Sequence, residues 1–330
     1  MNDRARWNGS RFRGDAGGHY ESWFLRGNHP SRPLAFWLRF TIFSPRGRPA
    51  EAVGEIWAVI FDGESGRTRA ARERVPMNRC AFGRGRLDVR VGAATLDDEG
   101  AEGSARDGAT NIAFRLRMEG GGAPALLLPE RLYRGPLPAA KTVVPRPSVR
   151  FWGRVDDGEG GFEVAGWPGS QNHNWGPRHT DRYAWGQVVG FAGAEDAFLE
   201  CSTAQLRLGR YWTPPLTVAV LRLGDVTHSF TGLRRSLASR GQIEETTWSF
   251  EARRDGVTLQ ARLEAPPSRF VGLTYDDPPG GTRLCLNCKL ASCELALARP
   301  GRPRLHLQTA NRAALELVGH EVPGVVVAVR

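Results

Sequence analysis

Two neighbouring stretches decide the fold: Gln171-Asn172-His173-Asn174-Trp175-Gly176 and, shortly after it, Tyr183-Ala184-Trp185-Gly186-Gln187. Hydrogen-bonding side chains and large aromatic rings are packed densely in both. Because side chains alternate between the two faces of a strand, Tyr183, Trp185 and Gln187 share one face. An aromatic face of this kind suits the inside of a closed sheet. The sequence therefore predicts β-strands around an apolar pocket that holds a few fixed polar groups.

The same pattern of short strands and turns runs through the rest of the chain. Aromatic and branched residues dominate 20–26, 34–43 and 55–61, and turn-forming residues separate these segments. Apolar residues rarely recur at helical spacing. The 40 glycines and 22 prolines are spread along the chain rather than gathered in tracts. The sequence predicts an all-β fold of antiparallel strands with little helix.

Length and pattern together predict two domains. The chain has 330 residues, and each half has an early strand that carries paired aromatics. We predict a disordered arm over residues 1–17, an N-terminal β-domain over 18–140, a linker over 141–148 and a C-terminal β-domain over 149–330. Residues 94–110, which are acidic and rich in Gly and Ala, are predicted to form a mobile loop.

The net charge of +10 does not indicate nucleic acid as a partner. The positive charge comes almost entirely from arginines that are mixed with acidic residues, with no basic run of five and no recognisable nucleic-acid motif. The first 18 residues lack the apolar segment of a signal peptide, and apolar runs such as 216–221 are too short to span a bilayer. We expect a cytoplasmic protein that does not insert stably into membranes. The sequence does not indicate its oligomeric state.

The five cysteines predict free thiols rather than a disulfide framework. Cys285, Cys288 and Cys293 have one feature of a zinc knuckle, but a second cysteine pair or histidines at ligand spacing are lacking. We therefore expect no metal and no cofactor, and the role of this cysteine cluster stays open.

The residues between 170 and 188 suit acid-initiated chemistry on an alkene. Such a reaction needs a proton donor, for which His173 is the candidate, and aromatic faces that stabilise positive charge, for which Trp175 and Trp185 are candidates. Asn174 and Gln187 would orient a polar group or a water molecule. A structural interpretation competes: the histidine and asparagines only satisfy backbone groups, and the tryptophans only fill a core.

Two blocks of the sequence carry a resemblance to known families. His19-Tyr20-Glu21-Ser22-Trp23-Phe24-Leu25-Arg26 resembles the opening strand of tocopherol cyclase-like proteins, and the stretch from Gln171 to Gln187 resembles a second block of that group. His173-Asn174-Trp175 is also similar to the His-x-Trp of hydroxyneurosporene synthase, the carotenoid 1,2-hydratase. Both families belong to a superfamily of paired lipocalin-like domains that includes AttH-like proteins and some fungal Diels-Alderase-type cyclases. The layout of most of residues 18–330 agrees, but only these two blocks are specific.

The resemblance implies two lipocalin-like antiparallel β-barrels or sheets, packed together, that bind an isoprenoid- or polyketide-like molecule. His173 and Trp175 match catalytic positions of the hydratase, whereas its Tyr and Asp have no clear counterpart near Glu200. The residues expected to line the ligand are Asn174, Tyr183, Trp185, Gln187, Trp23 and Glu21. The expected activity is hydration or cyclisation of an alkene, by a hydratase (a lyase) or a cyclase (an isomerase). A non-catalytic carrier or sensor of a hydrophobic ligand is the alternative, and a packed scaffold without a ligand is a third interpretation.

Overall fold

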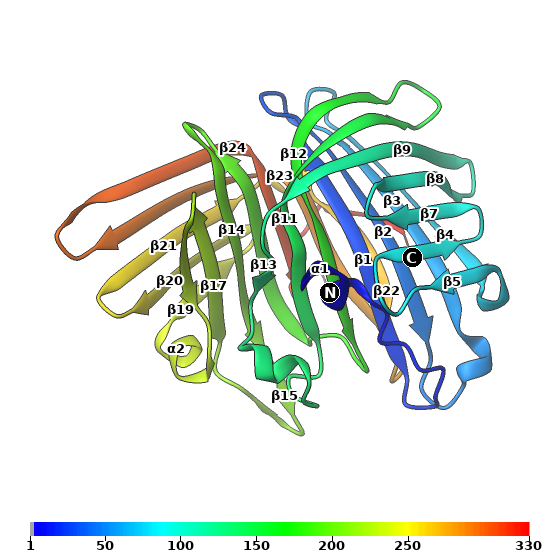
Figure 1. Cartoon of the computed structure of the whole chain (residues 1–330), viewed down its shortest axis with the longest axis horizontal. Helices are drawn as coiled ribbons and strands as arrows, with labels where there is room; N and C mark the ends of the chain where they lie inside the picture. The colour runs from blue at the N-terminus through cyan, green and yellow to red at the C-terminus, as the bar shows by residue number, and fades with distance from the viewer. Residues whose placement is uncertain (1–2, 330) are drawn as a thin grey trace.

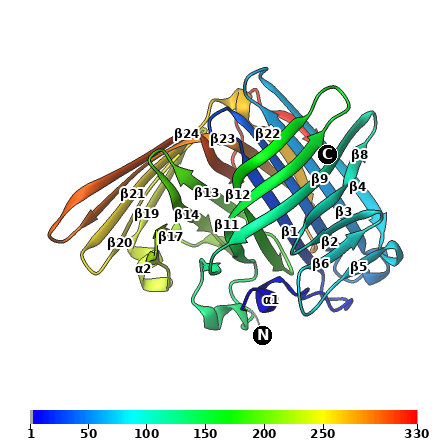
Figure 2. The same ribbon diagram turned by 45° about the horizontal axis from the view of Figure 1, so that its top comes forward.

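Antiparallel strands make up most of the molecule in this computed structural model, which describes residues 3–329 (Figure 1). Strands account for 65% of the chain and helices for 7%, so the prediction of an all-β fold is confirmed. The strands form two large sheets that lie side by side, and the first of them curls into a nearly closed barrel (Figure 2). Within residues 3–329, no helix is both long enough and apolar enough to cross a membrane.

The first sheet has twelve strands. In spatial order they are β4 (Arg67–Pro76), β3 (Val53–Asp62), β2 (Leu34–Ser44), β1 (His19–Asn28), β12 (Phe162–Gly176), β11 (Lys141–Asp156), β9 (Thr110–Gly121), β8 (Gly100–Asp107), β7 (Ala94–Asp97), β6 (Asp88–Val91) and β5 (Cys80–Phe82), with β10 (Ala125–Leu126) paired to β11.

The second sheet has eleven strands. Its order is β18 (Val226–Phe230), β17 (Leu216–Leu223), β14 (Ala194–Gln205), β13 (Arg182–Phe191), β24 (Arg302–Val318), β23 (Thr282–Arg299), β21 (Val257–Glu264), β20 (Thr247–Arg254) and β19 (Arg240–Glu244), and β22 (Val271–Asp276) joins β23 to β25 (Val326–Val329). A separate hairpin is formed by β15 (Arg207–Leu208) and β16 (Tyr211–Trp212). The α-helices are α1 (Asp3–Asn8) and α2 (Leu233–Ala238), and four 3₁₀ turns are η1 (Pro49–Glu51), η2 (Met77–Arg79), η3 (Glu130–Tyr133) and η4 (Pro267–Arg269).

The segment 141–148 is not a linker but the beginning of β11, which runs on to Asp156. Its prolines suggested a break because proline cannot donate a ladder hydrogen bond. The strand accommodates them by shifting its register against β12 between Val143 and Arg146 and again between Arg146 and Val149. Since β12 also pairs with β1, the first sheet extends to Gly176, well beyond the expected boundary at residue 140.

The described part of the arm, residues 3–17, is ordered and packed rather than disordered. It forms α1, in which Trp7 is buried and Asn8 is fully enclosed. Trp7 packs with Tyr133, Val143 and Trp175, which are more than 120 residues away in the sequence, so the polar composition of the arm gave no sign of this contact. Residues 94–110, expected as a mobile loop, form β7, β8 and the start of β9 instead.

Both faces of the central strands in the first sheet are buried, which explains why their sequences carry large side chains on both sides. In β2, Phe36, Leu38 and Phe40 face the barrel interior. Trp37 faces the other way and joins a core that is shared with the second sheet. We call the space between the two sheets, where these outward side chains meet β13, β14, β22 and β23, the junction.

Candidate functional site

The predicted site residues fall into two clusters on opposite faces of the first sheet. β1 and β12 pair so that Glu21 lies opposite Trp175 and Trp23 lies opposite His173. These four side chains point into the barrel, and Trp23 belongs to its core.

The other predicted residues, Asn174, Tyr183, Trp185 and Gln187, face the junction. Asn174 lies between two barrel-facing residues of β12 and therefore points to the opposite side of the sheet. The structure therefore does not bring these eight residues together in one cavity.

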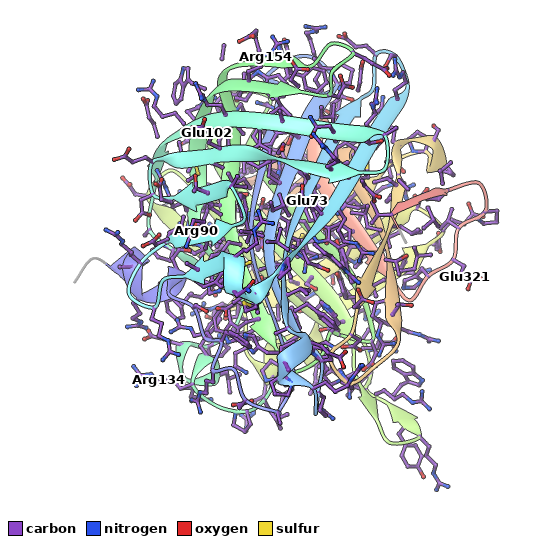
Figure 3. All side chains as sticks on the ribbon, turned by 90° about the vertical axis from the view of Figure 1, so that its right-hand side faces the viewer. Glu73, Arg90, Glu102, Arg134, Arg154 and Glu321 are labelled. Atoms are coloured by element: carbon purple, nitrogen blue, oxygen red, sulfur yellow. The ribbon has the colours of Figure 1, made fainter. Side chains whose placement is uncertain are left out.

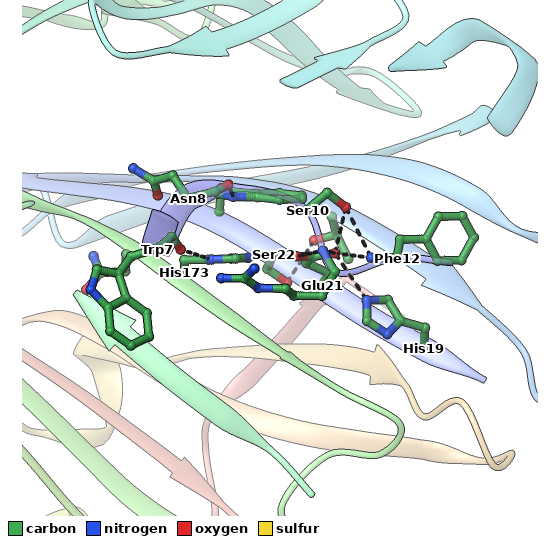
Figure 4. Close-up of polar contacts among 12 residues, drawn as sticks. Trp7, Asn8, Ser10, Phe12, His19, Glu21, Ser22 and His173 are labelled. Atoms are coloured by element: carbon green, nitrogen blue, oxygen red, sulfur yellow. Dashed lines mark hydrogen bonds and ion pairs between the residues drawn. The ribbon is translucent and has the colours of Figure 1, made fainter. Parts of the chain in front are cut away.

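The first cluster is centred on a buried histidine–carboxylate pair at one end of the barrel (Figure 4). His173 Nε2 lies 2.8 Å from Glu21 Oε1, and both side chains are fully buried. His19 Nε2 contacts the second carboxylate oxygen, Glu21 Oε2, at 3.1 Å. The ring of His173 lies between those of Trp23 and Trp175, with centroid separations of 4.8 and 4.7 Å.

The N-terminal arm covers this cluster and satisfies its polar atoms. The carbonyl oxygen of Trp7 accepts from His173 Nδ1 at 2.6 Å, and that of Asn8 accepts from Trp23 Nε1 at 2.9 Å. The side-chain amide of Asn8 forms paired hydrogen bonds with that of Gln171, at 3.1 and 2.9 Å. The carboxylate of Glu21 accepts from the Ser10 hydroxyl and from the backbone amides of residues 11 and 12.

Hydrogen bonding holds Glu21 as a carboxylate. Burial alone would raise the pKa of Glu21, but hydrogen bonds from His173 and His19 outweigh it and lower this pKa to about 2. The Trp7 carbonyl oxygen can only accept, so His173 Nδ1 donates to it, and His173 Nε2 lies against Glu21 Oε1. Because both ring nitrogens have partners within the protein, neither is free for a ligand while the arm is in place.

The second cluster lies at the junction and is centred on Glu200 of β14. The indole Nε1 of Trp185 donates to Glu200 Oε1, and Nε2 of Gln187 donates to Glu200 Oε2, each at 2.7 Å. Gln187 Nε2 also donates to Asn172 Oδ1 at 2.8 Å. The guanidinium of Arg26 donates to the backbone oxygen of Gln187 at 2.6 Å. Residues from both sheets thus hold this carboxyl group in place.

Glu200 is a buried acid that keeps its proton at neutral pH. Burial raises its pKa from 4.5 to about 8. Hydrogen bonds from Trp185 and Gln187 and the charge of Arg26 act in the opposite direction but are weaker. Glu200 is 1% exposed, so water does little to stabilise its ionised form.

A buried lysine, Lys289, also lies at the junction. Lys289 Nζ donates to Glu316 Oε1 at 2.7 Å and to Asn287 Oδ1 at 2.6 Å. Its ammonium group also lies 5.6 Å from the ring centroid of Trp37 and 5.5 Å from that of Trp185. Burial lowers the pKa of Lys289, and the Glu316 carboxylate opposes this shift. The two indole rings therefore already contact a positive charge at the junction.

Three buried polar atoms on the junction side of the first sheet have no hydrogen-bond partner: Trp37 Nε1, Arg26 Nε and Asn174 Oδ1. Native proteins rarely leave such atoms without a partner. Arg39 reaches the junction as well, where its guanidinium lies 4.4 Å from the ring centroid of Tyr275. The junction therefore combines aromatic rings, one protonated acid and several polar atoms.

None of the predicted site residues lines either of two hollows on the surface. One, of about 990 Å³, is an open polar concavity on the second sheet with Arg240, Glu251 and His306 in its lining. The other, of about 240 Å³, lies where Arg74 meets Asp276. Both have the character of solvent-facing polar surface rather than of an apolar pocket.

The cysteine cluster forms no metal site in the described chain. Cys285, Cys288 and Cys293 are buried free thiols, and burial raises the pKa of all three. Within residues 3–329, no group of three or more His, Cys, Asp or Glu side chains is arranged to hold a metal ion.

Sequence reasoning missed Arg26 and Lys289 and gave Glu200 only a marginal place. Each is a charged residue with large apolar neighbours in its strand, which is a usable signal because buried charges are rare unless paired. Lys289 is also one of only two lysines in the chain. These residues come together because strands far apart in the sequence pair with each other. Local sequence does not predict that pairing.

No family model matches the chain. Two uncharacterised proteins from strains of Mycobacterium tuberculosis, MT0513 and Rv0493c, are each 26% identical over 291 residues, which is 87% of this chain and 83% of theirs. Among solved structures, CghA with Sch210972 aligns with a TM-score of 0.58 and 14% identity, over 91% of this chain and 88% of CghA.

Two further structures are similar over nearly their whole length. Kievitone hydratase from Nectria haematococca gives a TM-score of 0.52 and 11% identity, over 98% of this chain and 93% of the enzyme. A Nitrosomonas europaea protein described as an AttH (NE1406) gives 0.54 and 12% identity, over 90% and 92%. The chain has the fold of the AttH-like proteins, which pair two lipocalin-like sheets, as the sequence resemblance predicted.

Proposed function

We propose that the chain binds a hydrophobic, alkene-bearing small molecule at the junction and catalyses its hydration or cyclisation, with Glu200 as the proton donor. The observation that carries the proposal is the state of Glu200: a fully buried carboxyl group whose pKa of about 8 keeps it protonated at neutral pH. General acids work best when their pKa lies near the working pH. A buried, protonated glutamic acid meets that requirement.

The proposed reaction starts with transfer of the Glu200 proton to one alkene carbon. Positive charge then develops on the other carbon, and the indole rings of Trp185 and Trp37 are placed to stabilise it, as they already do for the Lys289 ammonium. A water molecule or a second group of the same molecule forms the new bond to that carbon. The proton released in this step returns to the Glu200 carboxylate, so the acid is regenerated.

The unpartnered polar atoms support a ligand that also carries an oxygen function. Trp37 Nε1 and Arg26 Nε are donors, so both would bind a carbonyl or hydroxyl oxygen. Asn174 Oδ1 is an acceptor and would bind a hydroxyl group or the attacking water. A hydrophobic skeleton with a few oxygens, as in isoprenoid or polyketide compounds, has this chemistry. Two proteins with a similar fold support a small-molecule ligand for this chain: one is named kievitone hydratase, and the other, CghA, is described with Sch210972.

The proposal assigns a different role to His173 and Trp175 from the one that the resemblance implied. Both lie on the barrel side of β12, and the two ring nitrogens of His173 are engaged by the Trp7 carbonyl oxygen of the arm and by Glu21 of β1. In this proposal they hold the arm and the end of the barrel, while proton donation belongs to Glu200.

The test first identifies the ligand and then measures the incorporation of isotopes into the product. Protein purified under native conditions is extracted with organic solvent, and co-purified compounds are identified by mass spectrometry. The compound is then incubated with the protein in D₂O and, separately, in H₂¹⁸O. Both reactions place one deuterium on carbon, but only hydration adds ¹⁸O.

Two variants decide the role of the acid. Glu200→Gln keeps the size of the side chain but has no carboxyl proton, so we expect loss of turnover with retained ligand binding. Glu294→Gln, an exposed change on the same sheet, should leave turnover unchanged. Full turnover in Glu200→Gln would remove Glu200 as the donor. Tight binding with no isotope incorporation in the wild-type protein would instead identify a carrier or sensor.

A further inference from the structure

Three short segments at one end of the molecule share an unusual composition. They are residues 131–137 (RLYRGPL), 207–212 (RLGRYW) and 233–238 (LRRSLA). Each contains two arginines, none contains Asp or Glu, and each exposes at least one large apolar side chain. Among the described residues, these segments supply five of the seven large apolar side chains that are most exposed: Leu137, Tyr211, Trp212, Leu233 and Leu237.

The β15–β16 hairpin carries the aromatic pair. Tyr211 is 62% exposed and Trp212 is 38% exposed. The guanidinium of Arg182 lies 4.4 Å from the ring centroid of Trp212, and that of Arg210 lies 4.8 Å from the centroid of Tyr211. Exposed aromatic rings with arginines against them are typical of the interface between water and lipid.

Helix α2 presents an apolar face of its own. Leu233 and Leu237 are four residues apart, so they lie on the same side of the helix, and they are 67% and 51% exposed. Arg234 and Arg235 flank them. The third segment exposes Leu137 (71%) beside Arg134.

The three segments point to the same end of the molecule. α2 and β15 both lie at the lower end in Figure 1. Arg134 is at the lower end in Figure 3, where the view is turned about the vertical axis and the height is unchanged. Among the described residues, none of the six arginine guanidinium groups has a carboxylate partner. The nearby Glu130 pairs with Arg6, and Asp181, which accepts from the backbone amide of Arg207, pairs with Arg178 and Arg283. We call these three segments the basic–aromatic end.

We infer that the basic–aromatic end docks the protein reversibly on a membrane surface that contains anionic lipid. The six arginines without carboxylate partners match the negative charge of such a surface, and the exposed aromatic and leucine side chains are suited to shallow burial among the head groups. A protein partner would fit a continuous apolar patch better. Here the apolar groups sit on separate tips, each with its own pair of arginines. This inference does not depend on the chemistry proposed for Glu200.

The test uses the full chain and vesicles of defined composition. Phosphatidylcholine vesicles are compared with vesicles in which a third of the lipid is phosphatidylglycerol, and bound protein is measured by flotation. We expect binding to the anionic vesicles only, with release as the salt concentration rises. Absence of binding to anionic vesicles at low salt would overturn the inference and leave this surface to a protein partner.

Two double variants distinguish docking by the basic–aromatic end from non-specific attraction between a basic protein and an anionic membrane. Removing Arg234 and Arg235 by substitution with Gln should weaken binding about 25-fold, since one arginine at an anionic surface changes the affinity about fivefold. Substituting Arg90 and Arg302, which are exposed elsewhere, removes the same charge and should change binding less than threefold. Equal losses in the two double variants would show that net charge alone drives binding, and the proposed docking face would be wrong.

The apolar contribution is tested in the same way. Tyr211→Ser together with Trp212→Ser should lower binding at least tenfold, while Val326→Ser, which removes a side chain that is 72% exposed on β25, should have no effect. All these positions are exposed, so the variants should keep the wild-type fold, which circular dichroism checks. Unchanged binding in the Tyr211 and Trp212 double variant would contradict insertion of the hairpin.

Discussion

Replacing Glu200 by Gln should change how the stability of the protein depends on pH. In the folded chain the pKa of Glu200 is raised from 4.5 to about 8 because the carboxyl group is buried. Between these two pH values the folded state keeps the proton and the unfolded state releases it. The unfolded state then binds fewer protons, so stability falls as the pH rises through this window. Glutamine does not titrate, so the variant lacks this loss.

The size of the effect follows from the two pKa values. Each unit of difference corresponds to about 1.4 kcal/mol, so ionising Glu200 in the folded protein costs roughly 5 kcal/mol at pH well above 8. Between pH 5 and pH 8, the stability difference between Glu200→Gln and wild type should shift by roughly 3 kcal/mol in favour of the variant. A constant offset is expected too, because the glutamine NH₂ must face either the Trp185 or the Gln187 donor. The offset does not vary with pH, so the slope is the quantity to compare.

Urea denaturation at a series of pH values measures this slope. Glu294→Gln, an exposed substitution on the same sheet, serves as the control and should give a curve parallel to wild type. The reasoning fails if the Glu200→Gln curve also runs parallel to wild type between pH 5 and 8. In that case Glu200 is already ionised in the folded protein, and a carboxylate cannot be the proton donor that we propose.

Three further substitutions test the barrel end and the packing. Glu21→Gln should remove a stabilisation that is present above pH 4.5 and is lost as the pH falls towards 2, seen as a flatter acid-denaturation curve. Asn8→Ala removes the donor to the buried Gln171 Oε1 and one of the two acceptors of Gln171 Nε2 and should cost about 1–3 kcal/mol in thermal unfolding. Gly169→Ala should destabilise by about 1–3 kcal/mol, because its Cβ would lie 2.0 Å from the backbone oxygen of Arg26, whereas Gly85→Ala meets nothing within 4 Å and should be neutral.

Strand pattern predicted the fold class well because alternation of side chains is a local property. The strand expected over 34–43 agrees closely with β2, Leu34–Ser44. Domain limits were predicted poorly because they depend on which strands pair. β12 pairs with β1, more than 140 residues earlier, and composition carries no sign of that. The polar composition of the arm predicted disorder because the partners of Trp7 lie far away in the sequence, at Tyr133, Val143 and Trp175.

The residues that we predicted as one site lie on two opposite faces of the first sheet. The stretch from Gln171 to Gly176 is dense in polar and aromatic groups because both faces of β12 are covered, one by the barrel and the arm and the other by the second sheet. The density of functional groups suggested one cavity, whereas it reflects two environments separated by a single strand. His173 and Trp175 serve one of them, and Asn172 and Asn174 serve the other.

β12 therefore separates the two clusters and contributes residues to both of them. Asn172 Oδ1 accepts from Gln187, which in turn holds Glu200. The next residue, His173, is held by the arm on the opposite face. A change in how the arm seats against His173 would move the backbone of β12 and with it the amide that positions the proposed acid. For this reason Asn8→Ala should alter the turnover of an identified substrate even though Asn8 lies on the far side of the sheet from Glu200. Equal turnover in Asn8→Ala and wild type would show that the two clusters act independently.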